Sequence, residues 1–447
     1  MLFIAFFFTY HFEFLDVLPI GDESYHLGDG LLKEGLSGLN MFSGEWSFLG
    51  HPPLYRITLY LWFRVFPATY LSGHQHALFF SFLTIASFYY ICFLNINWFS
   101  SLVAAIVLMS IPPFYIDIYR CIADIPALFF FIFTMIQIQK GNIKLSSLGL
   151  LLLVMIRESG IALPLSMIFI FLIKFHKQPL KDLLIVVLPG MLYLLIFFLS
   201  NKFIFGTFSN HPYATGDLKH IDDSISFFSV GPSKWQMFKE IIYRLSINCG
   251  KVLELGAWLG FFLLFYEKIS KPLKYTSALI FLYGFGYIVF FTFYEDTLDR
   301  DLIPTYSAII FLAFSGLNKL PKKYAILSSL VIGLVTISPN SWISEGREKK
   351  KDRDFYVQIA KVIEKDFSEK TICLTYPLNS LREKVYGYFD EKISLKDNCN
   401  DPEVLLITSM LSDFEWKKWS KYINKNKLDL KVEKNLSSKW YKIYVKQ

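Results

Sequence analysis

Long apolar runs separated by short polar connections dominate the chain from its first residue to about residue 340. The hydrocarbon core of a membrane is about 30 Å thick and is crossed by roughly 20 helical residues, fewer where flanking lysines and arginines reach the interface. The pattern therefore predicts a polytopic α-helical membrane protein. About eleven transmembrane helices are expected, at 1–18, 75–94, 98–116, 124–139, 145–157, 159–174, 182–200, 250–266, 275–293, 302–317 and 324–340.

The apolar region 145–174 is interrupted at its middle by Arg157 and Glu158. Charged side chains are costly at the centre of a bilayer, and lysines flank both ends of this region. Two short helices that place the pair at the membrane surface satisfy both observations. A single long span would reverse the sidedness of every later segment, so the hairpin is the better interpretation.

Lysines gather in alternate connections between the predicted helices, within 140–144, 174–181, 268–274 and 319–323. Lysine and arginine in short loops mark the cytoplasmic side of a membrane protein. The N-terminus is therefore predicted to be cytoplasmic, in a multi-pass protein of the plasma (inner) membrane. The tail that follows the last helix is then extracytoplasmic.

Two long outer loops are expected, at 19–74 and 201–249. The first contains an apolar stretch, 52–67, that is interrupted by Arg56 and Arg64. If this stretch spanned the membrane, the sidedness of every later lysine cluster would reverse. A helix that lies along the outer interface fits the pattern better.

Beyond residue 340 the pattern changes to alternating polar-helical and strand-like segments. This alternation is typical of a small α/β domain. The chain is therefore divided into a transmembrane domain, 1–340, and a soluble extracytoplasmic domain, 341–447. Cys373 and Cys399 lie in the second domain and can pair if it faces an oxidising compartment, although the sequence gives no distance between them.

Composition supports a membrane protein and excludes several other classes. Hydrophobic residues make up 53% of the chain and charged residues 19%, whereas a soluble domain carries about 25% charged residues. The net charge is +7, but no basic stripe with interleaved aromatic residues suggests nucleic-acid binding. The glycine-containing runs lack the spacing of a phosphate-binding loop, so nucleotide binding has no support.

Charged residues and one histidine gather at the predicted outer ends of the helices. They are Asp22, Glu23, His51, Arg120, Asp124, Arg157, Glu158 and the group Glu295, Asp296, Asp299, Arg300 and Asp301. A lipid-linked sugar phosphate would present its head group at this surface. Sugar transfer requires a carboxylate that accepts the proton of the acceptor and a cation that stabilises the departing phosphate. Arginine suits the second task because its planar fork matches phosphate oxygens.

Each of these residues also has a purely structural interpretation. Asp22 can simply begin a solvated loop, and His51 can cap the interfacial helix before two prolines. Asp124 can cap the helix that follows it. Arg157 and Glu158 can form an ion pair that ends a hairpin, and Arg300 can belong to a solvated loop. These alternatives remain open on the sequence alone.

Five segments resemble, in order and spacing, the family-39 glycosyltransferases of the GT-C superfamily, which include protein O-mannosyltransferases and aminoarabinose transferases. The segments are DESYH at 22–26, GHPPLY at 50–55, RCIADIPALFF at 120–130, RESG at 157–160 and DRDLIP at 299–304. The resemblance covers roughly 1–340, and the tail resembles the soluble domains of superfamily members in its placement only. It implies a polyprenyl-phosphate sugar as donor, and the bacterial character of the composition makes undecaprenyl phosphate the expected carrier.

The resemblance also implies roles for particular residues. Asp22 would be the catalytic carboxylate, with Glu23 as its helper. The other implied substrate-binding residues are His51, Arg120, Asp124, Arg157, Glu158 and Arg300, the last facing the lipid phosphate. No cofactor is required, and a divalent cation beside Asp22 and Asp124 is allowed but not demanded. A carboxylate stands near the His51 position in the aminoarabinose transferases, so a shared metal-ligand role is not carried over to His51.

The leading hypothesis is an enzyme that transfers a sugar from a polyprenyl-phosphate donor to an extracytoplasmic acceptor, with inversion. A transporter or flippase is the main alternative. Transporters tend to place charged and helix-breaking residues near mid-membrane and to contain internal repeats, whereas the charges here gather at one surface. A membrane scaffold and a polymerase or ligase that uses a diphosphate-linked glycan are further alternatives. The sequence identifies neither the sugar nor the acceptor.

Overall fold

This computed structural model describes two separate units of the chain, one helical and one α/β. The described residues are 52–118, 120–173, 179–205, 234–263, 271–292, 299–317, 320–336, 355–374, 393–397, 403–408, 413–436 and 439–446. The predicted first helix, 1–18, and most of the first outer loop lie outside these residues.

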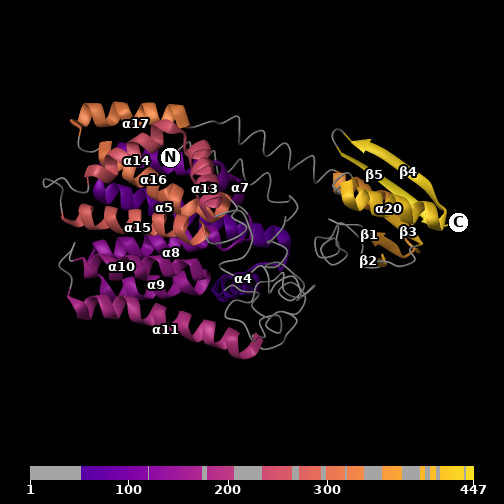
Figure 1. The fold of residues 1–447 in the computed structure, drawn as a ribbon, viewed down its shortest axis with the longest axis horizontal. Coiled ribbons are helices and arrows are strands. Elements are labelled where there is room, and N and C mark those ends of the chain that lie inside the picture. The colour runs from indigo at the N-terminus through magenta and orange to yellow at the C-terminus, as the bar shows by residue number, and fades with distance from the viewer. Residues whose placement is uncertain are drawn as a thin grey trace. The chain divides into compact units, whose positions relative to one another are not determined.

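The helical unit is a bundle whose helices run side by side (Figure 1). Its elements are α4 (Leu54–Val65), α5 (Tyr70–Asn95), α6 (Trp98–Ser110), α7 (Pro112–Asp117), α8 (Asp124–Gln139), α9 (Ile143–Ile156), η2 (Glu158–Ile161), α10 (Ala162–Leu172), α11 (Leu180–Phe205), α13 (Lys234–Cys249), α14 (Lys251–Leu263), α15 (Lys271–Thr292), η4 (Asp299–Leu302), α16 (Ile303–Leu317) and α17 (Lys322–Thr336). Each predicted span from residue 75 onward coincides with one or two of these elements. The span 98–116 is divided because Pro112 and Pro113 lack the backbone N–H that would continue α6.

The outer surface of the bundle is strongly apolar. By length and composition, Leu71–Asn95 and Leu180–Ser200 are each sufficient to cross a membrane, and six further apolar helical stretches of the described chain are shorter. A row of leucines is exposed along α11 at helical spacing, namely Leu184, Leu188, Leu192, Leu195 and Leu199. Such a surface is unfavourable in water but suits contact with lipid chains.

Glycines allow close helix packing inside the bundle. A Cβ atom at Gly260 of α14 would overlap the backbone carbonyl of Leu312 in α16. Gly284 of α15 likewise faces Ala308 of α16, where an added Cβ would lie 2.8 Å from the alanine Cβ. Small residues at such crossings are typical of helices packed within membranes, because close backbone approach supplies much of their association energy.

Two helices, α4 and α13, lie across the same end of the bundle (Figure 1). With 12 residues, α4 is about 18 Å long and lies within the apolar stretch 52–67, whose placement along the outer interface stays a prediction. Within the predicted outer loop 201–249, α11 continues to Phe205, and a further helix, α13, runs from Lys234 to Cys249. In α13 the apolar side chains recur at helical spacing, so Ile241 and Leu245 are buried while Tyr243 is exposed.

The described turn 140–142, which lies within the lysine connection 140–144, joins α8 to α9. There α5 and α8 both end, and Asn95 and Gln139 exchange two side-chain amide hydrogen bonds of 3.0 Å each. Lys140 follows directly and lies over the ring of Tyr90.

The α/β unit contains a five-stranded mixed sheet in the order β2-β1-β3-β5-β4. Its elements are a helix at 355–366, β1 (Ile372–Leu374), β2 (Leu395–Asp397), β3 (Val404–Thr408), α20 (Asp413–Asn426), β4 (Leu428–Leu436) and β5 (Lys439–Lys446). Strands β1, β2 and β3 are parallel, whereas β5 is antiparallel to β3 and β4.

Side chains of β3 alternate between two cores, one on each face of this sheet. Val404 and Leu406 pack with the helix at 355–366, whereas Leu405 and Ile407 pack with residues of α20. Cys373 of β1 is fully buried and is disulfide-bonded. The cysteine predicted to pair with it, Cys399, lies outside the described residues.

Candidate functional site

Buried charged residues gather where α8 and α16 begin and α9 ends. Asp117, Asp124 and Asp301 are each at most 5% exposed, and the side chain of Arg157 is 12% exposed. A buried charge is unfavourable unless it is paired. The contacts of these residues therefore determine what this end of the bundle can do.

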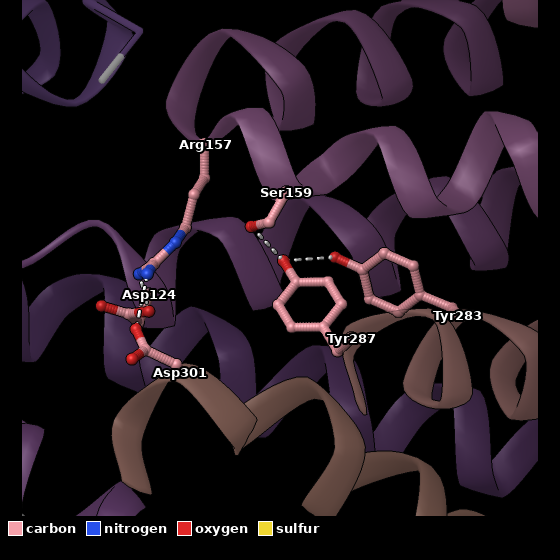
Figure 2. A network of polar contacts seen from close by, with 6 residues as sticks. All are labelled: Asp124, Arg157, Ser159, Tyr283, Tyr287 and Asp301. Atoms are coloured by element: carbon pink, nitrogen blue, oxygen red, sulfur yellow. Dashed lines mark hydrogen bonds and ion pairs between the residues drawn. The ribbon is translucent and has the colours of Figure 1, made fainter. Parts of the chain in front are cut away.

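One guanidinium joins two carboxylates in what we call the Arg157 cluster, formed by Asp124, Arg157 and Asp301 (Figure 2). Nη1 of Arg157 pairs with Asp124 at the start of α8. Nη2 of Arg157 donates to Oδ1 of Asp301 in η4, at 2.6 Å. The planar fork of arginine suits this double contact.

The backbone around Arg157 explains how its side chain reaches both partners. Helix α9 ends at Ile156, and Arg157 adopts an extended conformation before η2 begins at Glu158. The chain then reverses into α10, as the hairpin interpretation of 145–174 predicts. The reversal is tight, because a Cβ atom at Gly160 would lie 2.9 Å from Cγ of Leu153.

A chain of hydroxyl groups anchors the same turn to α15 (Figure 2). The hydroxyl groups of Ser159 and Tyr287 are 2.9 Å apart. The hydroxyl of Tyr283, one helical turn away on α15, donates to that of Tyr287 at 3.2 Å. The ring of Tyr283 stacks on Phe131 of α8 at a centroid distance of 3.8 Å. Arg157 and Ser159 of the RESG segment thus contact α8, η4 and α15.

A second ion pair lies within the segment that connects α7 with α8. Nη1 of Arg120 donates to Oδ1 of Asp117 at 2.9 Å, and the backbone N–H of Arg120 donates to the carbonyl of Asp117 at 3.0 Å. This pair is local in sequence. It holds Arg120 at the same end of the bundle as the Arg157 cluster.

Helix α4 is fixed on α5 by aromatic contacts around His76. The imidazole of His76 lies 5.6 Å from the ring centroids of both Tyr55 and Trp62, and Nε1 of Trp62 donates to Oγ of Ser72 at 3.1 Å. On the same helix, burial lowers the pKa of Arg56 to about 10. Arg56 therefore stays charged at neutral pH and adds a buried cation to this end of the bundle.

The structure brings together some predicted site residues. Asp124 and Arg157 are paired, and Glu158 is half-buried at the start of η2. The backbone of Arg300 lies in η4, directly before Asp301. The cap interpretation of Asp124 is wrong, because the cap position is Ala123 and Asp124 is the first residue of α8.

Other predicted and missed residues complete the comparison. Asp22, Glu23 and His51 lie outside the described residues. Asp117 was not predicted as a site residue, and Asp301 was predicted only as one charge of the group at 295–301. The DRD triplet at 299–301 is the signal that could have directed attention to Asp301. Among the described residues there is no group of three or more His, Cys, Asp or Glu side chains arranged to hold a metal ion.

Comparison with solved structures relates the whole chain to one fold. The chain aligns with the crystal structure of ArnT from Cupriavidus metallidurans bound to undecaprenyl phosphate, with a TM-score of 0.63 and 12% sequence identity, over 99% of this chain and 97% of that one. The chain has the fold of ArnT. The apo crystal structure of the same protein aligns over the same shares, with a TM-score of 0.58 and 11% identity. No protein-family model matches the chain, and no curated protein matches it significantly.

Proposed function

We propose that the protein is an integral-membrane glycosyltransferase that transfers a sugar from a polyprenyl-phosphate donor to an extracytoplasmic acceptor. The observation that carries this proposal is the ArnT fold along 99% of the chain. ArnT is a GT-C aminoarabinose transferase, and its crystal structure holds undecaprenyl phosphate. The fold agrees with the superfamily resemblance of the sequence segments.

The proposed reaction is a single displacement at the anomeric carbon of the sugar. A hydroxyl or amine of the acceptor attacks this carbon while Asp22 accepts its proton. The bond from the carbon to the phosphate oxygen breaks, and its electron pair leaves with the lipid phosphate. Arg300 stabilises the negative charge that develops there. Attack opposite the leaving phosphate inverts the configuration.

Other residues are proposed to surround this centre. Glu23 assists Asp22, and His51, Arg120, Asp124 and Glu158 border the donor. A divalent cation beside Asp22 and Asp124 would neutralise phosphate charge when bound. Asp124 already pairs with Arg157, so any such cation would share this carboxylate with the guanidinium.

The proposed location is the inner membrane, with a cytoplasmic N-terminus and an extracytoplasmic tail. The alternation of the helices supports a common side for the lysine-rich connections. The disulfide at Cys373 supports an oxidising environment for the tail, because structural disulfides persist outside the reducing cytoplasm.

Release of sugar from its lipid carrier tests the proposal. Purified full-length protein is reconstituted in liposomes with radiolabelled polyprenyl-phosphate sugars extracted from host membranes, and an extract of the host envelope serves as acceptor. Release by the wild type and not by Asp22→Asn is expected. Equal release by both would retain the transferase and discard Asp22 as the base. If neither folded protein releases sugar, but the wild type moves the labelled lipid across the bilayer, a flippase replaces the proposal.

A further inference from the structure

Arg157 was predicted from the sequence to contact the substrate, but its terminal nitrogens are directed at protein carboxylates. Nη1 pairs with Asp124 and Nη2 with Asp301, and both carboxylates are buried. To bind a phosphate, the guanidinium would have to release at least one of them into a buried site. Leaving a buried charge unpaired is strongly unfavourable. The contacts therefore favour a role within the protein.

The turn that carries Arg157 is itself firmly held. Ser159 is hydrogen-bonded to Tyr287 of α15, and Gly160 packs against Leu153 of α9 with no room for a side chain. Phe131 and Tyr283 stack between α8 and α15 deeper in the bundle. Arg157 thus extends from a fixed base toward two other elements.

The elements that Arg157 reaches are those that carry predicted site residues. Asp124 begins α8 and follows closely after Arg120. Asp301 lies in η4, a single four-residue turn that also contains Arg300. Asp301 is 144 residues from Arg157 in the sequence, so their ion pair fixes the position of η4 against a distant part of the chain.

We propose that Arg157 is a positioning residue, which holds η4, and with it Arg300, in place against α8, and does not contact the donor. The expected loss of sugar release rests on the proposed function, in which Arg300 stabilises the lipid phosphate. The expected opening of η4 rests only on the contacts of the Arg157 cluster. The two parts are measured separately.

Charge balance provides a test that separates positioning from substrate contact. In Arg157→Gln the two buried carboxylates lose the guanidinium that joins them. In the double variant Arg157→Gln with Asp301→Asn, one carboxylate remains, so the net charge of the cluster equals that of the wild type, and the two amides can hydrogen-bond to each other. Positioning therefore predicts that the second substitution partly rescues the first. Direct contact with the phosphate predicts no rescue.

Hydrogen exchange of the 299–302 segment in the reconstituted full-length protein is the structural measurement. We expect Arg157→Gln to accelerate exchange there about tenfold or more through local opening, and the double variant to restore much of the protection. Arg244→Gln is the matched control, because Arg244 pairs with Glu240 at the exposed surface of the single helix α13. It should leave exchange at 299–302 unchanged.

Sugar release from the labelled donor fraction is the kinetic measurement. We expect kcat of Arg157→Gln to fall about 100-fold, as a small misplacement of a catalytic group can cause. KM should change little, because the phosphate charge that Arg300 meets develops in the transition state. The double variant should recover about tenfold of the lost kcat. Arg157→Lys retains the charge but lacks the planar fork. It replaces Arg157→Gln in these measurements if that variant does not fold. Its loss of kcat is expected to lie between those of the wild type and Arg157→Gln.

The inference is overturned if Arg157→Gln, or Arg157→Lys in its place, exchanges like the wild type at 299–302. It is also overturned if the double variant is no faster than Arg157→Gln while KM for the donor rises. If the wild type releases no sugar, the proposed function fails, and the exchange measurement alone then decides whether Arg157 positions η4.

Discussion

The two ends of the helical bundle solve the same packing problem with different chemistry. At the end where α5 and α8 finish, these two helices are joined by the neutral amides of Asn95 and Gln139. At the other end, α8 is joined to α9 and η4 by the charged Arg157 cluster. The first junction is formed by two neutral hydrogen bonds, whereas the second is formed by buried ions.

This difference indicates which end is adapted for chemistry. A buried ion pair contributes little net stability compared with a well-packed apolar contact. Its presence at only one of these two helix junctions is therefore explained better by function than by folding. The same end also carries Arg56 of α4 and the Asp117–Arg120 pair. The comparison predicts different responses to matched substitutions at the two ends.

The largest effect is expected from Arg157→Met, which removes the cation and leaves Asp124 and Asp301 buried together. Loss of one partner from a buried ion pair costs about 3–5 kcal/mol of stability. Thermal unfolding of the purified protein in detergent measures this loss. A loss below about 1 kcal/mol would show that the cluster is hydrated and would weaken the contrast between the ends.

A smaller effect is expected from Asn95→Ala at the opposite end. This substitution leaves the amide of Gln139 without its partner and should cost about 1–3 kcal/mol by the same unfolding measurement. The double variant Asn95→Leu with Gln139→Leu replaces both polar groups, so it should lie close to wild-type stability. If the double variant were less stable than Asn95→Ala, the amide pair would contribute stability beyond satisfying its own hydrogen bonds.

Ser159→Ala is expected to have a still smaller effect, since it removes one neutral hydrogen bond to Tyr287. The expected loss is about 1 kcal/mol, with exchange at 299–302 changed less than in Arg157→Gln. Tyr287→Phe is the complementary variant. If both single variants lose similar stability and the double variant loses no more than either, the two substitutions remove the same hydrogen bond between Ser159 and Tyr287.

The smallest effect is expected from Arg244→Gln on α13. Its pair with Glu240 is exposed and lies within one helix, and such pairs contribute about 0.3–0.5 kcal/mol. High salt should reduce this difference further, because exposed charges are screened. If Arg244→Gln lost as much stability as Arg157→Met, exposure would not explain the difference between the surface ion pair and the buried one.

Much of the helical framework could be predicted from the sequence, because lipid exposure and burial both require long apolar runs. The break at Arg157 was predicted for the same reason, since two adjacent charges are unfavourable at mid-bilayer. Helix α13 was missed because its polar face makes the segment resemble a loop when hydrophobicity is averaged. Its periodic apolar positions, including Ile241 and Leu245, were the available signal.

The sequence indicated several residues of the site but not the contacts between them. Asp124 and Arg157 were both expected at the outer surface, but their pairing depends on how α8 and α9 turn toward each other. Asp301 was seen only as one charge in a cluster, because its partner is 144 residues away in the sequence. Contacts at such separation depend on the packing of the whole bundle, which a single sequence does not specify locally.

The central claim is that the charged end of the bundle carries out sugar transfer and the neutral end does not. The most direct test is the rate of sugar release in proteoliposomes for the wild type, Asp124→Asn and the double variant Asn95→Leu with Gln139→Leu, each at equal amounts of folded protein. The account predicts a loss of about 100-fold for Asp124→Asn and a wild-type rate for the double variant. Equal losses in both variants, or a loss confined to the neutral end, would contradict it.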